Sequence, residues 1–387
     1  MAKNIQHEKI HAFILSIVGN CLHSKQISSL SNAVQGIVYA ASLALSVIGK
    51  ALAAAQGLDP RHATKQVDRL FSNKKINLIL FFSNWVSFLV QVRSQIIVSL
   101  DWTDYDKDDH CTLALNLITN HGRATPMLWK TYNKSKLKNH RSECERDLLN
   151  QLKILLPSSC IQVIILADRG FGDVRFYDFI RSIGFHFIIR FKCNIYMNVN
   201  GVMRPAKDWL LNKAKLYQNV GLTLSGYVVK SVVCVRTRRM KEAWYLASSL
   251  GENNTTIAAC KTSMIIKLYG RRFSCEENFR DIKDIRFGMG LSSVSIKSAA
   301  RRDRILMASA IAVSLLTILG AAGEAIGLDR LLRTGTAKKR THSLFTQGCF
   351  YFMAMVNYKL ERFEMIMKKY AELLREHAVF KGLFSFI

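Results

Sequence analysis

Between residues 95 and 190, strand-like and helix-like patterns alternate in an order that few folds accommodate. The first three segments, Ile96–Leu100, Cys111–Thr119 and Arg123–Tyr132, are typical of strands. Asn120-His121-Gly122 separates the last two and is a short hairpin signal. The sequence therefore predicts three strands, the second and third joined by a tight turn.

The same region continues with two helices and two further strands. Arg141–Leu156 predicts a helix that ends at Pro157, and the apolar run Ile161–Ala167 suits a central strand buried on both faces. Val174–Ile183 then predicts a helix, and Phe185–Arg190 a strand. Three strands, a helix, a strand, a helix and a strand is the order of a ribonuclease-H-like α/β core.

The flanking regions follow other patterns. Residues 1–92 predict helices, residues 195–261 alternate as short strands in a β-rich insertion, and helix returns near residue 262. We expect the core to comprise residues 93–194 and 262–324. The region 325–387 is expected to be helical, and its pattern Phe363, Ile366, Met367 and Tyr370 suggests a packed helix that could serve dimerisation.

The charge balance points to a polyanionic partner. The chain has 55 Lys+Arg against 28 Asp+Glu, a formal net charge of +27, and such an excess costs stability through self-repulsion. Nucleic acid is favoured over a ribosome-like or membrane-surface role because the basic clusters are dispersed among aromatic and apolar segments. The basic segment Lys65–Phe71 fits a DNA-binding domain in residues 1–92, and equally a helical cap on the core. The clusters are Arg236, Arg238, Arg239 and Lys241; Arg271 and Arg272; Arg301, Arg302 and Arg304; and Lys338, Lys339 and Arg340.

The cysteines and the apolar stretches indicate the cellular compartment in which the protein works. Nine cysteines are scattered singly without a C-x-x-C pair, which favours a reducing cytoplasm over a zinc site. Lys3, Glu8 and Lys9 interrupt any signal-peptide pattern. The uncharged stretches 26–49 and 305–322 fit buried core helices better than membrane spans. We expect a cytoplasmic protein with no membrane association.

Two aspartates follow apolar strands directly. Asp101 and Asp168 are each followed by turn residues, and carboxylates at strand ends lie where open α/β sheets bind ligands. Two such carboxylates on neighbouring strands can share a hard cation. Either one could instead cap the segment that follows it. Spacing also does not select Asp101 from the further aspartates Asp104, Asp106, Asp108 and Asp109.

A third carboxylate lies in a segment expected to be one helix, Tyr269–Lys283. At about 100° per residue, Tyr269, Arg272, Glu276 and Lys283 fall within an arc of about 60°, whereas Glu277 points elsewhere. That face offers one metal contact flanked by phosphate contacts. An ordinary solvated face with an Arg272–Glu276 ion pair would show the same pattern.

These residues resemble a known family. Tyr269, Arg272, Glu276 and Lys283 reproduce the spacing Y-x2-R-x3-E-x6-K of DDE transposases of the insertion-sequence "four" family. Asp-Arg-Gly-Phe at 168–171 and Trp-x-Leu-Ala at 244–247 also match, and the resemblance extends over roughly residues 60 to 320.

The resemblance implies a role for each matching residue. Asp101, Asp168 and Glu276 would be the catalytic residues and would bind two Mg²⁺ (or Mn²⁺) ions about 4 Å apart. The cations Arg272 and Lys283 would grip transposon-end phosphates together with Tyr269. Trp244 would stack on a flipped base; the alternative is a core aromatic on the insertion sheet.

The resemblance also implies the reaction and the partners. These are cut-and-paste transposition through a hairpin intermediate, with double-stranded terminal repeats and target DNA as substrates and a homodimer as the working form in the bacterial nucleoid. The alternatives are a metal-dependent nuclease of the same fold and an inactive, transposase-derived DNA-binding protein.

Overall fold

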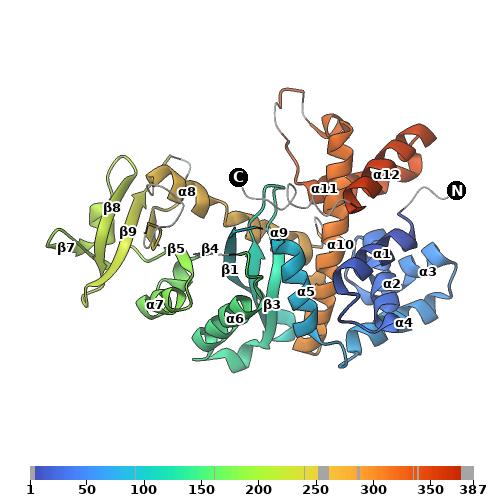
Figure 1. Ribbon diagram of the computed structural model, residues 1–387, viewed down its shortest axis with the longest axis horizontal. Coiled ribbons are helices and arrows are strands. Elements are labelled where there is room, and N and C mark those ends of the chain that lie inside the picture. Colours follow the sequence, from blue (N-terminus) through green and yellow to red (C-terminus); the bar gives the residue numbers. More distant parts are fainter. Residues whose placement is uncertain are drawn as a thin grey trace.

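A computed structural model describes residues 5–91, 93–160, 162–238, 240–251, 261–285, 288–333, 335–337 and 340–375. Among the basic clusters, Arg239, Lys338 and Lys339 lie outside these residues. The described chain is mixed α/β, with helices at both ends of the sequence and the strands between them (Figure 1).

A single ten-stranded sheet runs through the molecule in the order β3-β2-β1-β4-β5-β10-β9-β8-β6-β7. The pairs β1–β4 and β4–β5 are parallel, and every other neighbouring pair is antiparallel. The strands are β1 (Gln95–Tyr105), β2 (His110–Leu117), β3 (Thr125–Asn133), β4 (Gln162–Ala167), β5 (His186–Arg190), β6 (Tyr196–Val199), β7 (Val202–Pro205), β8 (Lys215–Leu222), β9 (Tyr227–Val235) and β10 (Trp244–Ser248).

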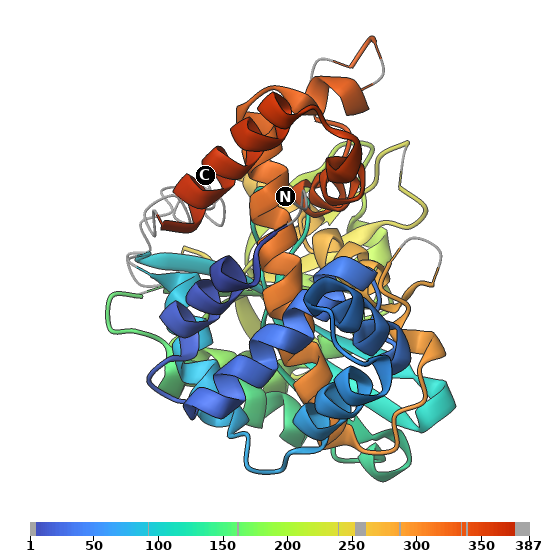
Figure 2. The same ribbon diagram turned by 90° about the vertical axis from the view of Figure 1, so that its right-hand side faces the viewer.

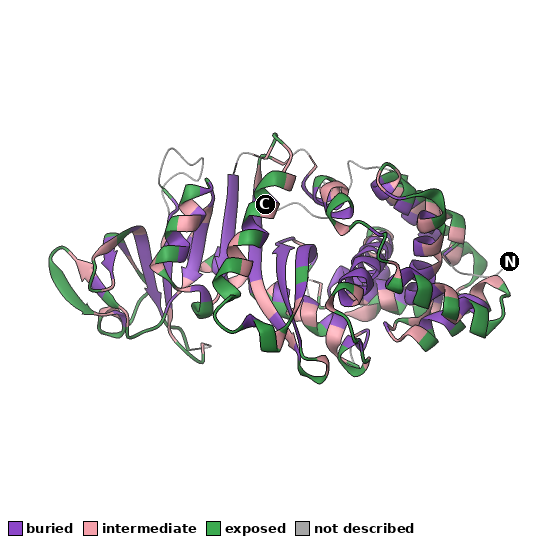
Figure 3. Cartoon of the chain, turned by 90° about the horizontal axis from the view of Figure 1, so that it is seen from below, coloured by how far each residue is buried: buried purple, intermediate pink, exposed green. Residues whose placement is uncertain are grey.

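The central strands are buried on both faces because helices cover both sides of the sheet. Along β4, Ile164 and Leu166 belong to a smaller apolar core with residues of α8 and α9. Their neighbours Val163 and Ile165 belong to a larger core with residues of α5, α6, α7 and α10. Figure 3 shows these strands as buried between partly exposed helices. These helices are α5 (Leu78–Val90), α6 (Arg141–Leu155), α7 (Val174–Ser182), α8 (Thr262–Gly270), α9 (Phe273–Lys283) and α10 (Ala299–Ala325).

The strand-rich segment after residue 195 extends the same sheet. β10 pairs antiparallel with β5, with Ala247 opposite Ile189, and β6 to β9 continue outward from β10. The short strands are thus placed as expected, but they form no separate sheet. Whether residues 195–261 are a domain of their own stays a prediction, and residues 252–260 lie outside the described chain.

Helix α10 is the central support of the helical side. It packs against α2, β3, α11 and α12, and Figure 2 shows it running between the N-terminal and C-terminal helices. It is the one described helix that is long and apolar enough on its own to cross a membrane, and 94% of its most apolar window is buried within the protein. The remaining long helices are α1 (His7–Val18), α2 (Ser24–Ala40), α3 (Leu45–Gln56), α4 (Pro60–Ser72), α11 (Leu344–Ala354) and α12 (Leu360–Arg375).

Glycine allows α10 and α11 to touch backbone to backbone. A Cβ at Gly320 would lie 1.9 Å from the Leu344 carbonyl oxygen, and one at Gly348 would lie 1.8 Å from that of Leu316. No side chain fits at either position, so the C-terminal helices are fixed closely on α10.

Candidate active site

The parallel pairing of β1 and β4 places two of the predicted carboxylates side by side, but β1 continues to Tyr105, so Asp101 lies within its strand and not at its end as predicted. Leu100 pairs with Ala167, so Asp101 and Asp168 follow at equivalent positions on neighbouring strands. Glu276 lies in the first turn of α9, which packs against β1. The fold thus brings all three predicted residues to one region.

The pKa of Asp101 depends on both of the other carboxylates. The pKa of Asp101 is raised to about 6, mainly because burial penalises its charged form. The Arg272 guanidinium and the Trp102 N–H lower this pKa, whereas Glu276 and Asp168 raise it further. Converging like charges in a partly dehydrated site favour the binding of a cation.

Arg272 supplies positive charge between two of these groups. Its guanidinium lies 3.3 Å from Asp101 Oδ2 and 2.6 Å from Glu276 Oε1, and its side chain is only 5% exposed. Among the described residues, no three His, Cys, Asp or Glu side chains are grouped closely enough to hold a metal ion. The carboxylate donor set fits Mg²⁺ or Mn²⁺ chemically, but Arg272 would have to loosen its contacts for such an ion to be bound.

The segment expected to be one helix, Tyr269–Lys283, is two helices. α8 ends at Gly270, α9 begins at Phe273, and the junction is a tight turn in which Arg272 N–H donates to Tyr269 O at 3.0 Å. The single-face prediction was therefore wrong in its geometry. Lys283 still lies near the other residues of the predicted site. Its Nζ donates to Thr103 Oγ1 (3.1 Å) and to the Asp104 carbonyl (2.6 Å), and both acceptors follow Asp101 on β1.

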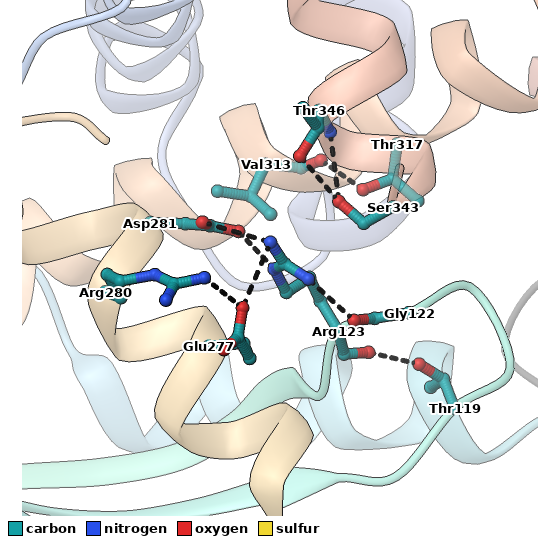
Figure 4. A network of polar contacts seen from close by, with 10 residues as sticks. All are labelled: Thr119, Gly122, Arg123, Glu277, Arg280, Asp281, Val313, Thr317, Ser343 and Thr346. Atoms are coloured by element: carbon teal, nitrogen blue, oxygen red, sulfur yellow. Dashed lines mark hydrogen bonds and ion pairs between the residues drawn. The ribbon is translucent and has the colours of Figure 1, made fainter. Parts of the chain in front are cut away.

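Glu277, the residue after Glu276, belongs to a separate polar network (Figure 4). Arg123, from the loop between β2 and β3, donates from Nε to Asp281 Oδ2 at 2.5 Å and approaches Glu277 Oε2 at 3.5 Å. Arg280 also pairs with Glu277. This network holds the far side of α9 and leaves Glu276 directed toward Asp101.

The other aspartates near Asp101 bind partners of their own. Asp101 lines a pocket of about 680 Å³ with Glu276 and Lys283, whereas Asp168 does not line it. Nearby aspartates instead tie the end of β1 to the surrounding chain: Asp104 and Asp106 pair with Lys134, Asp108 with Arg302, and Asp109 with Ser135. That Asp101 is the ligand stays a prediction; of the five aspartates, it is the one that lines this pocket together with Glu276.

The predicted DNA contacts differ in accessibility. Tyr269 is 1% exposed, and burial raises the pKa of its phenol to about 12. Trp244 is half-buried, with its ring centroid 5.0 Å from that of Tyr269 and 5.9 Å from that of Phe273. Direct phosphate contacts by Tyr269 or Arg272 would require a rearrangement, whereas Lys283 is already half-buried at the pocket wall.

Sequence reasoning missed Arg123, which holds α9, and the pair Arg190 and Glu242 beside Asp168. Arg190 Nη2 donates to Glu242 Oε2 at 2.6 Å, and Arg169 Nη1 lies 3.2 Å from the same oxygen. Arg169 is part of the Asp-Arg-Gly-Phe match, which was the one available signal. Arg123 and Glu242 stand outside every motif.

Comparison with known families bears on this site. Residues 132–315, just under half of the 387-residue chain, match the model of the transposase DDE domain. The matched region contains Asp168 and Glu276 and begins after Asp101. No curated protein matches the sequence. Residues 132–315 are therefore similar to a transposase DDE domain, and this similarity supports a transposase function.

Proposed function

We propose that this chain is a cut-and-paste transposase of the insertion-sequence "four" family with a ribonuclease-H-like catalytic core. The observation that carries the proposal is the juxtaposition of Asp101 and Asp168 on adjacent parallel strands, with Glu276 facing them from α9. The strand order β3-β2-β1-β4-β5 supports the core assignment. The Tyr269, Arg272, Glu276 and Lys283 spacing supports the family.

The substrate is the double-stranded terminal repeat of the element, and afterwards target DNA. Asp101, Asp168 and Glu276 would hold two Mg²⁺ or Mn²⁺ ions, which when bound activate the attacking hydroxyl and stabilise the leaving oxygen during in-line displacement at phosphorus. Arg272 and Lys283 balance the phosphate charge beside that centre. The liberated 3′-OH attacks the opposite strand to give a hairpin, which is reopened before joining to the target.

Two outer regions complete the proposed assembly. The N-terminal helices bind the DNA end, and the exposed basic side chains Arg61, Lys65 and Arg69 on α4 support this. The C-terminal helices are suited to contact a second copy, because Met353, Val356 and Leu360 are more than half exposed there. The working form is a homodimer, because two element ends must be held at once. Its proposed place of action is the nucleoid in the cytoplasm.

Strand joining distinguishes this function from its rivals. Pre-cut element ends, taken from the inverted repeats that flank the gene, are incubated with supercoiled plasmid and Mg²⁺ or Mn²⁺. We expect joined products from the wild type and none from Asp168→Ala. Cleavage without joining would indicate a nuclease of the same fold. DNA binding without either reaction would indicate an inactive transposase derivative.

A further inference from the structure

A second pocket, of about 510 Å³, lies beside Asp168 and is distinct from the pocket that Asp101 and Glu276 line. Its wall carries four cations, Arg169, Arg190, Lys192 and Lys207, and Glu242 is its one carboxylate among the lining residues. Arg169 directly follows Asp168, Arg190 ends β5, and Glu242 precedes β10. The lining side chains therefore carry a net charge of three positive units, which is the electrostatic signature of an anion site.

Glu242 is the anion that this pocket now holds. Its Oε2 accepts from Arg190 Nη2 at 2.6 Å and lies 3.2 Å from Arg169 Nη1. The hydrogen bond from Arg190 is the main reason why the pKa of Glu242 is lowered; the charges of Arg169 and Arg190 add to it, and Asp168 opposes it. Both arginines thus converge on one oxygen close to a proposed metal ligand.

The geometry favours replacement of Glu242 by a stronger anion. The Glu242 side chain is 57% exposed and lies outside any helix or strand, so little holds it except the two arginines. Arg190 is better fixed, because its Nη2 also donates to the Ala243 carbonyl at 3.2 Å and its side chain is 16% exposed. The Arg190 Nε is buried and has no hydrogen-bond partner among the described residues. A phosphate offers more oxygens than a carboxylate for such donors.

We propose that this pocket binds a backbone phosphate of the DNA strand next to Asp168, and that Glu242 is an internal anion which this phosphate displaces. The inference rests on the proposed function only in taking DNA as the ligand. It assigns Arg169, Arg190, Lys192 and Lys207 to DNA binding and gives Glu242 an opposing role: it weakens DNA binding by competing for Arg169 and Arg190.

The test is DNA binding by the full-length chain in EDTA, with a short fluorescent duplex of random sequence as the probe. Glu242→Gln keeps the size of the side chain but removes its charge. We expect it to tighten binding by about three- to tenfold, the range for releasing two exposed ion pairs. The matched control is Glu364→Gln on α12, an exposed carboxylate at the helical end of the molecule, for which we expect a change of about twofold or less (Figure 1).

Two further substitutions test whether the tighter DNA binding of Glu242→Gln arises in this pocket. Lys207→Gln, at an exposed position, should weaken binding without changing the unfolding midpoint. In an Arg190→Gln background, Glu242→Gln should give no gain, because the two residues act as a coupled pair. The proposal is overturned if Glu242→Gln tightens binding no more than Glu364→Gln does, if it weakens binding, or if its gain persists without Arg190.

The design separates this proposal from the proposed function. No strand is cut in EDTA, so a gain in Glu242→Gln can stand even if strand joining with Mg²⁺ fails. Inorganic phosphate, matched in ionic strength with chloride, distinguishes a free phosphate from a backbone phosphate. If Arg190→Gln abolishes the binding of inorganic phosphate but leaves the affinity for the duplex unchanged, the pocket holds a free phosphate and the backbone assignment is overturned.

Discussion

Burial and charge act on Asp101 in opposite directions, and the balance leaves its pKa at about 6. Such a carboxyl is ionised at neutral pH although it is partly shielded from water. A partly buried carboxylate attracts a cation more strongly than a fully hydrated one does. Asp104, by contrast, is 41% exposed at its side chain and pairs with Lys134 at 2.9 Å. The two neighbours on β1 thus have different surroundings, although the sequence could not separate them.

Asp101→Asn and Asp104→Asn therefore form a matched pair of substitutions. We expect Asp101→Asn to reduce strand joining by about a hundredfold or more, because a metal ligand is lost. We expect Asp104→Asn to stay within about threefold of the wild type, since its ion pair with Lys134 is partly exposed and Asp104 does not line the pocket of Asp101 and Glu276. Joining rates of both variants, measured at saturating Mg²⁺, show which of the two aspartates is the metal ligand. Full activity in Asp101→Asn would overturn the assignment of Asp101.

Asp303 predicts how stability depends on pH. Burial raises the pKa of this carboxyl from 3.8 to about 7, although it accepts from Thr131 N–H at 3.0 Å. Its proton is bound more tightly in the folded state, so its stabilising contribution is complete below the unfolded pKa and is lost as pH rises through about 7. Asp303→Asn removes this loss, because the amide stays neutral.

Denaturant unfolding of Asp303→Asn and the wild type measures this difference. Relative to the wild type, the variant should gain about 2 kcal/mol in free energy of unfolding between about pH 5 and about pH 8. A difference between the two proteins that does not change with pH would show that Asp303 is ionised throughout or is not buried in solution.

At the scale of elements, Arg123 connects the β2–β3 loop to α9. It pairs with Asp281, whose side chain is 8% exposed, on the face of α9 opposite Glu276. Arg123→Ala leaves that carboxylate buried without its partner, and we expect a loss of about 3 kcal/mol in unfolding free energy. Arg280→Ala, which removes a half-exposed partner of Glu277, should cost about 1 kcal/mol or less.

Arg123 is a positioning residue, so its effect on the reaction should differ from a general loss of folding. With α9 loosened, Glu276 is held less firmly, and the Mg²⁺ concentration for half-maximal joining should rise while DNA affinity in EDTA stays unchanged. Reversal of the pair, Arg123→Asp with Asp281→Arg, should restore part of the metal affinity. An unchanged Mg²⁺ requirement in Arg123→Ala would contradict the role.

Helix α4 offers a second test at this scale. Asp59 caps its N-terminus by accepting from the Arg61 and His62 N–H groups, and Gly57 in the left-handed conformation ends α3 just before it. Two helices joined by such a short turn resemble a helix-turn-helix unit. Arg61, Lys65 and Arg69 are spaced four apart and exposed, so they form one basic stripe.

Each stripe residue that contacts a phosphate releases counterions. Changing Arg61, Lys65 or Arg69 to Ala should therefore lower the dependence of log Kd on log salt by about one unit per residue. Lys368→Ala on α12 serves as the control with the same charge change. Equal slopes in all four variants and the wild type would place the DNA elsewhere.

The elements show where sequence reasoning succeeds. The strands of the region 95–190 were predictable because burial on both faces demands apolar runs such as the one before Asp168. The break at Arg271 and Arg272 was not predictable, since helical periodicity continues across it and Arg272 contacts Asp101, a residue far away along the chain. Sequence analysis did not identify Arg123 and Glu242, because their partners lie far away along the chain and are brought near only by the sheet.

At the scale of the whole molecule, one sheet and one helix connect all the parts. Two of the three proposed ligands lie in β1 and directly after β4. The same sheet extends through β10 to β7, which lies at the end opposite the N-terminal helices (Figure 1). α10 packs against β3 on one side and against α2, α11 and α12 on the others. The site is therefore braced by one continuous body, whose net charge of +27 suits a long polyanion.

The central claim is that three carboxylates carry metal-dependent DNA strand chemistry, and Glu276 tests it best because Glu277 is a matched control on the same helix. Nicking of supercoiled plasmid that carries the element ends should be measured with Mg²⁺ or Mn²⁺ for Glu276→Gln and Glu277→Gln. The account predicts loss of nicking by about a hundredfold or more in Glu276→Gln, with the same fold and DNA affinity as the wild type. Glu277→Gln should keep most of the activity. Wild-type nicking in Glu276→Gln would contradict the claim.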